Sequence, residues 1–133
     1  MKFEFIPREM THMASTHLRL NTATLSALSR GRYRQFVERV IHHLREHFPH
    51  RCPPEGGWAA FVEKAIVIAE KHGFETERKV VLCCNLLFVL GLELFDGPPG
   101  DWPVVILSDA SLDADEKLKR MYEKAYAELR RGA

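Results

Sequence analysis

The chain has 133 residues, of which 46% are hydrophobic and 28% are charged, and its formal net charge is +1. This length is typical of a single domain, and the composition is that of a globular protein, which argues against disorder. A net charge so close to zero supplies no long-range attraction to nucleic acid or to an anionic membrane. We therefore expect one folded domain that binds neither.

The location of the protein is predicted from its apolar segments and its cysteines. The first residues contain no apolar stretch of the kind found in signal peptides. The most apolar run, residues 80–94, is interrupted by Asn85 and Glu93. It is also shorter than the roughly 20 residues that cross a bilayer. The chain has three cysteines, an odd number, and Cys83 and Cys84 lie inside this run. We therefore expect reduced core cysteines in a cytoplasmic protein that has no disulfide framework.

The N-terminal segment, residues 1–17, shows no steady helical period. Phe3 and Phe5 alternate with polar residues as in a short strand, and Ile6 and Pro7 follow them. We interpret this segment as an N-terminal arm that lies on the domain or on a partner. Residues 18–133 are then the helical domain.

Two helices are expected before residue 50. Asn21 is a favourable N-cap for the first, and Leu20 and Leu25 have the spacing of a hydrophobic staple around it. Gly31 marks a potential break before a longer second helix. In that helix, apolar side chains recur at helical spacing: Tyr33, Phe36, Val37, Val40, Ile41, Leu44 and Phe48. Pro49 ends it, because the residue before a proline is pushed out of helical geometry.

A proline- and glycine-rich loop, residues 52–57, separates these helices from a third that starts at Trp58. Gly73 has the position of a left-handed C-cap, and Phe74 can make the apolar contact that accompanies such a cap. Thr76 is then expected to cap a fourth helix.

The fourth helix, about residues 77–92, is apolar on nearly every side. A helix without a polar face must be covered all round, so we expect this segment to be the central element of the fold, with Leu87 and Phe88 buried. A buried strand is the alternative. The run is longer than the roughly 4–8 residues of a typical strand, which favours the helix.

The C-terminal part begins with a proline-stiffened loop, residues 95–103, that carries two aromatic residues. Residues 104–107 could form a short strand or one helical turn, and we favour the turn because a lone strand has nothing to pair with. The last helix, residues 113–131, has acidic residues at its start and arginines at its end, as the helix dipole favours. The predicted fold is all-α: a single compact bundle of four to six helices.

The histidines are the first place to look for a metal site. His43 and His47 are four residues apart, which could place two imidazoles on one side of a helix, and His50 and Cys52 follow. The glutamate of an H-E-x-x-H site is missing, and no second motif supplies further ligands. We therefore interpret the histidines as solvated or at the boundary of the core.

Other reactive residues also lack a supporting pattern. Cys83 and Cys84 are adjacent rather than spaced as C-x-x-C, so a place in the core is expected. The acidic residues around the start of the last helix lack the spacing of a calcium-binding loop. Nucleotide-binding glycine motifs and the G-x-S-x-G elbow are absent from the sequence. We therefore predict that the protein is not an enzyme and has no catalytic residue, no cofactor and no metal.

One segment of the chain is basic. Between Arg30 and Arg51 there are six arginines and two glutamates, a balance of +4 before histidines are counted. The arginines flank the apolar stripe of the second helix, so a solvated helix face is the expected role. Nucleic-acid binding would need polar base-reading residues on the same face. An acidic protein partner is a second use of this charge.

Two groups of residues, in a fixed order, go beyond what amphipathic helices require. The first group is Leu18-Arg19-Leu20-Asn21, Leu25, Arg34-x-Phe36-Val37 and His43-Leu44-Arg45-x-His47-Phe48-Pro49. The second group is Asn85-Leu86-Leu87-Phe88-Val89-Leu90-Gly91, Phe95-Asp96, Trp102, Ile106-Leu107-Ser108-Asp109 and Leu118-x-x-Met121-Tyr122. With these residues the chain resembles a group of small helical proteins encoded beside type VI secretion spike genes.

The resemblance covers about residues 18–129. It implies a non-enzymatic adaptor or co-chaperone that helps to load a toxic effector onto the spike. Its partners would be an adaptor chaperone, the effector toxin and the VgrG or PAAR spike proteins. The chain departs from the pattern in one loop, where such proteins usually carry Pro-Trp and here Asp101 precedes Trp102. An immunity protein that neutralises a cognate toxin is the alternative from the same gene neighbourhoods, and a hidden enzyme is the least supported.

Partner-binding residues are expected among apolar side chains outside the helical stripes, since aromatic anchors dominate interface energetics. They are Phe3, Phe5 and Ile6 in the arm, and Phe95, Asp96 and Trp102 in the loop. The alternative is that both segments fold back and cap the ends of the bundle. The arm is the better candidate, because it can add a strand to a partner or lay alternate side chains into a groove.

Overall fold

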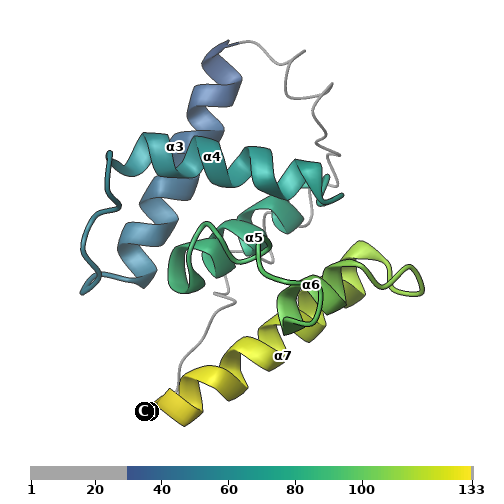
Figure 1. Ribbon diagram of the computed structural model, residues 1–133. Coiled ribbons are helices and arrows are strands. Elements are labelled where there is room, and N and C mark those ends of the chain that lie inside the picture. The colour runs from purple at the N-terminus through teal and green to yellow at the C-terminus, as the bar shows by residue number, and fades with distance from the viewer. Residues whose placement is uncertain (1–29, 133) are drawn as a thin grey trace.

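The computed structural model describes residues 30–132, and within this range the chain forms five α-helices and no strand. The helices are α3 (Arg30–His47), α4 (Trp58–Lys71), α5 (Glu77–Leu90), α6 (Trp102–Leu107) and α7 (Ala114–Gly132) (Figure 1). The prediction of an all-α bundle is therefore confirmed. The expected arm, its residues Phe3, Phe5 and Ile6, and the Asn21 cap lie outside the described residues.

The first described helix, α3, ends at His47, two residues before Pro49, as the sequence predicts. The described part of the chain begins at Arg30, so the expected break at Gly31 stays a prediction. Its buried stripe contains Phe36, Val37, Val40 and Leu44. The arginines that flank this stripe within the described part of the chain are exposed, as expected for a solvated helix face.

Local signals set the boundary between α4 and α5. The Phe74 N–H donates to the Ala69 carbonyl at 3.0 Å, and the Gly73 N–H donates to the Glu70 carbonyl at 3.1 Å. With Gly73 at a φ of 91°, these bonds form the Schellman motif, and the Phe74 side chain is fully buried beneath it. The Thr76 hydroxyl then accepts from the Lys79 N–H at 3.2 Å, which is the predicted N-cap.

The central position of α5 is confirmed. The helix packs against α4 on one side and α7 on the other, while α3 covers α4 and α6 packs on α7 (Figure 1). Every residue from 80 to 87 is buried. Residues 104–107 belong to the short helix α6, so the helical turn is confirmed over the strand. None of the described helices is both long and apolar enough to cross a membrane.

One prediction about the histidines is wrong. His43 is neither solvated nor at the boundary, because only 7% of its surface is exposed. Its Nε2–H donates to Asn85 Oδ1 at 2.9 Å, and the His47 Nδ1–H donates to the His43 carbonyl at 3.0 Å. The helical wheel places His43 beside Val40 and Leu44 but cannot show that α5 offers an amide there. A buried imidazole is stable in this position because it has a hydrogen-bond partner.

Candidate functional site

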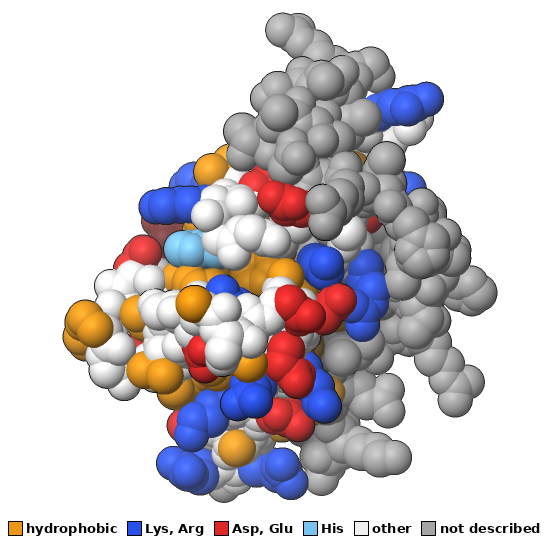
Figure 2. Space-filling model, turned by 90° about the vertical axis from the view of Figure 1, so that its right-hand side faces the viewer, with side chains coloured by type: hydrophobic (Ala, Val, Ile, Leu, Met, Phe, Trp, Pro, Cys, Tyr) orange, Lys and Arg blue, Asp and Glu red, His pale blue; other side chains and the backbone are white. Residues whose placement is uncertain are grey.

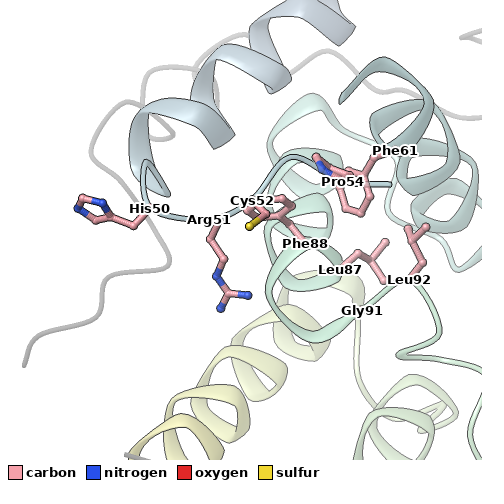
Figure 3. A pocket seen from close by; sticks show the side chains of 9 residues that line it. All are labelled: His50, Arg51, Cys52, Pro54, Phe61, Leu87, Phe88, Gly91 and Leu92. Carbon is pink, nitrogen blue, oxygen red and sulfur yellow. The ribbon is translucent and has the colours of Figure 1, made fainter. Parts of the chain in front are cut away.

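An apolar groove lies at the C-terminal end of α5, beside the loop that joins α3 to α4. We call it the α5 groove; it is open to solvent and has a volume of about 490 Å³. Its walls are formed by His50, Arg51, Cys52 and Pro54 from the loop, Phe61 from α4, and Leu87, Phe88, Gly91 and Leu92 from the end of α5 (Figure 3). Three segments that are distant in sequence therefore build one surface.

The floor of the α5 groove is aromatic and held on several sides. The Phe88 ring lies 5.4 Å from the rings of Phe48 and Trp58 and 5.6 Å from that of Phe61, measured between ring centroids. Phe88 itself is half-buried, so part of its ring contributes to the surface. Contacts of this kind fix a ring in one orientation and add stability beyond the area that they bury. The floor is therefore preformed.

The local sequence explains why the groove stays open. α5 ends at Gly91, which has a φ of 108°, and the Gly91 N–H still donates to the Leu87 carbonyl at 2.9 Å. The chain then turns away, so no further helical turn covers Phe88. On the other side, Pro53 and Pro54 keep the α3–α4 loop out of helical geometry. The loop forms a wall beside the end of α5 without filling the space over it.

The charged side chains among the described wall residues have one sign. Arg51 and His50 are the charged or ionisable residues among them apart from the Cys52 thiol, and none of these described wall residues is acidic. In Figure 3 the Arg51 guanidinium extends from the loop, while the His50 ring points away from the cavity. Arg51 is exposed and forms no ion pair with any described acidic residue. Glu55 and Glu93 are exposed and are not wall residues, but the Glu93 carboxylate lies over the Gly91 backbone, with its Oε2 atom 3.2 Å from where a Cβ on Gly91 would be. An acidic group therefore stands at the edge of the groove, at Gly91.

Cys52 is the exposed cysteine of the chain, and it is one of the residues that line the groove (Figure 3). The other two cysteines, Cys83 and Cys84, are fully buried in α5, as the sequence predicts. Burial raises the pKa of Cys84 to about 12 and that of Cys83 well above its ordinary value. Because the thiolate is the reactive form, neither buried thiol can act as a nucleophile near neutral pH.

A second concave region lies between α5 and α7 and has a volume of about 560 Å³. Its wall residues are Arg78, Leu82, Asp115, Leu118, Lys119, Tyr122, Glu123 and Tyr126. Two cations face two carboxylates here, and Arg78 already lies 3.4 Å from Asp115. Figure 2 shows Lys and Arg side chains interspersed with Asp and Glu over the face that includes α7. A balanced surface of this kind is typical of solvated protein and selects no particular partner.

The three loop residues that were predicted to bind a partner, Phe95, Asp96 and Trp102, differ in how deeply they are buried. Phe95 is buried with 8% of its surface exposed, and its ring lies 5.1 Å from that of His72. Trp102 is half-buried and packs on the core, whereas Asp96 is exposed. The Phe95 side chain therefore follows the alternative in which the loop folds back onto the bundle. The partner-binding role of Phe95, Asp96 and Trp102 stays a prediction.

Sequence reasoning did not single out the α5 groove. The available signal was the apolar character of α5, which continues past the end of the helix to Leu92, opposite a proline-rich loop. Only the packing shows that the described helices leave this end uncovered. Within residues 30–132, no three His, Cys, Asp or Glu side chains come close enough together to hold a metal ion.

Comparison with known proteins adds no relative. No protein-family model matches the chain, and no curated protein or solved structure is significantly similar to it. The resemblance to small type VI secretion proteins therefore stays a prediction from the sequence.

Proposed function

We propose that this protein is a non-enzymatic adaptor or co-chaperone that binds other proteins and helps to load a toxic effector onto the type VI secretion spike. The observation that supports protein binding is the α5 groove, an open apolar surface with a fixed aromatic floor. Open grooves with aromatic anchoring points are typical of sites that take side chains of a partner. The secretion setting is supported by the resemblance of residues 18–129.

The partners in this proposal are an adaptor chaperone, the effector toxin and the VgrG or PAAR proteins of the spike. The affinity-tagged full chain should retain the effector or the adaptor chaperone encoded beside its gene. Deleting the gene should abolish export of that effector and leave export of the spike proteins intact. Normal effector export in the deletion strain would contradict the loading role.

An immunity protein would also bind the effector, so binding alone does not separate the two functions. Co-expression of the effector toxin with this protein separates them. A loading adaptor should leave toxicity unchanged in cells that lack the natural immunity protein. Full rescue of growth would show that the protein neutralises the toxin, and the adaptor proposal would then be wrong.

A further inference from the structure

We propose that the α5 groove binds a short acidic segment of the partner protein, with one bulky apolar side chain over Phe88 and a carboxylate against Arg51. This inference rests on the protein-binding part of the proposed function and specifies the chemistry of the partner.

The apolar half of the inference comes from the floor and walls. Phe88 is surrounded by other rings, and Leu87, Leu92 and Pro54 add aliphatic walls (Figure 3). A volume of about 490 Å³ lies within the roughly 300–1,000 Å³ of pockets that take a drug-sized ligand. The groove is therefore large enough for one anchoring side chain and its neighbours, and too small for a folded element. Since the floor is preformed, the anchor binds without first ordering the site.

The acidic half comes from a comparison of the two concave regions. In the region between α5 and α7, Arg78 and Lys79 approach Asp115 to 3.4 and 3.9 Å, so an incoming carboxylate would have to displace an internal one. In the α5 groove, Arg51 has no such partner among the described residues, and none of the described wall residues is acidic. An exposed cation without an ion-pair partner selects an acidic partner and speeds its approach more than it strengthens the complex.

The chain contains its own reporter for this site. It has three cysteines, of which Cys83 and Cys84 are inaccessible and Cys52 lines the groove. A thiol reagent such as dithionitrobenzoate should therefore modify one cysteine in the folded protein and all three in denaturant. A bound segment would cover Cys52 and slow its modification. This readout reports occupancy of the groove itself, which a pull-down does not.

Two kinds of probe are added to the full chain. The first is the purified effector or adaptor chaperone encoded beside the gene. The second is a synthetic peptide with a central Leu-Phe pair flanked by glutamates, and its control carries lysines in place of the glutamates. At about ten times the dissociation constant, nine-tenths of the groove is occupied, so modification of Cys52 should slow about tenfold. The lysine peptide should leave the rate unchanged.

Matched variants test the two halves of the inference. Arg51→Glu reverses the exposed charge and Leu92→Asp places a carboxylate in the apolar wall. Their controls are Lys64→Glu and Val67→Asp on the exposed side of α4, where Val67 is 63% exposed and lies outside the groove. The groove variants should weaken binding of the acidic probe by about tenfold or more, as loss of a central anchoring contact does. The controls should bind as the parent does. Because Arg51 is exposed, Arg51→Glu remains informative even if Leu92→Asp fails to fold by circular dichroism.

Each outcome separates the inference from the proposed function. If the neighbouring proteins bind but Cys52 stays fully reactive and Arg51→Glu has no effect, the inference is overturned and the protein-binding role stands. If they do not bind while the acidic peptide protects Cys52, the proposed partners are wrong and the inference stands. If the neighbouring proteins do not bind and the acidic peptide does not protect Cys52, both are wrong. If deleting residues 1–17 alone exposes Cys52 further in the free protein, the groove is occupied by this chain and not by a partner, which also overturns the inference.

Discussion

Replacing Leu86 by alanine tests whether α5 is the structural centre of the protein. The Leu86 side chain is fully buried in the described core and does not line the α5 groove, so its loss affects packing alone. Truncation of a buried leucine removes its burial free energy and leaves a cavity, which together cost about 2–5 kcal/mol. A domain of this size has an unfolding free energy of roughly 5–15 kcal/mol, so the variant should lose about a third of its stability. Val67→Ala on the exposed side of α4 is the matched control.

Urea unfolding followed by circular dichroism measures this loss. With a slope of about 2 kcal/mol per molar urea, the midpoint should fall by about 1–2.5 M and the slope should stay constant. Val67→Ala should shift the midpoint by less than about 0.3 M, because most surface substitutions change stability by under about 0.5 kcal/mol. A loss below about 1 kcal/mol for Leu86→Ala, or one equal to that of the control, would refute the central position of α5.

Three further predictions concern the cap, the buried thiols and the arm. Thr76→Ala should cost about 0.5–2 kcal/mol in the same assay, because the Lys79 N–H loses its acceptor, and Thr76→Ser should restore most of it. Burial raises the pKa of Cys84 to about 12 and also raises that of Cys83, so the folded chain retains protons that unfolded thiols release above their ordinary pKa of 9.0. The free energy of unfolding should therefore fall as the pH rises from about 9 towards 12, by at most about 1.4 kcal/mol per pH unit for each thiol, and a flat profile would contradict the burial. Deleting residues 1–17 should leave a helical domain that binds its partner more weakly, measured by circular dichroism and pull-down; unchanged binding would place the contact surface on the helices.

The helices described here could be predicted because their signals are local. Pro49 ends α3, the Gly73 turn ends α4, and Thr76 starts α5, and each acts through backbone geometry or through hydrogen bonds to residues within one turn. The uniform apolarity of residues 77–92 identified the central helix for a related reason, since such a helix has no face that can meet water. These features need no knowledge of how the helices pack.

The α5 groove and the burial of His43 could not be predicted, because both depend on contacts between helices. Phe88 has the same apolar character as Leu87 in the sequence, yet Leu87 is fully buried and Phe88 is only partly buried. His43 and His47 are both candidates for the edge of a stripe, and only the position of Asn85 on another helix distinguishes them. His43 and Asn85 are 42 positions apart in sequence, and Phe88 contacts Trp58 and Phe61, which lie on another helix.

The polar residues inside the core explain how the end of α5 is oriented. A helix that is apolar all round can rotate about its axis with little change in the area that it buries, so apolar burial alone leaves its rotation poorly specified. Asn85 removes this freedom, because its fully buried amide accepts from His43 on α3 and also hydrogen-bonds the Tyr122 hydroxyl of α7. The same hydroxyl donates to the Leu82 carbonyl at 2.7 Å.

A rotation of α5 that broke these hydrogen bonds would leave buried polar groups without partners, which costs about 1–3 kcal/mol for each group. Phe88 lies three residues after Asn85, almost one helical turn, so the rotation that satisfies the amide also turns the Phe88 ring towards Phe48, Trp58 and Phe61 and thereby forms the floor of the α5 groove.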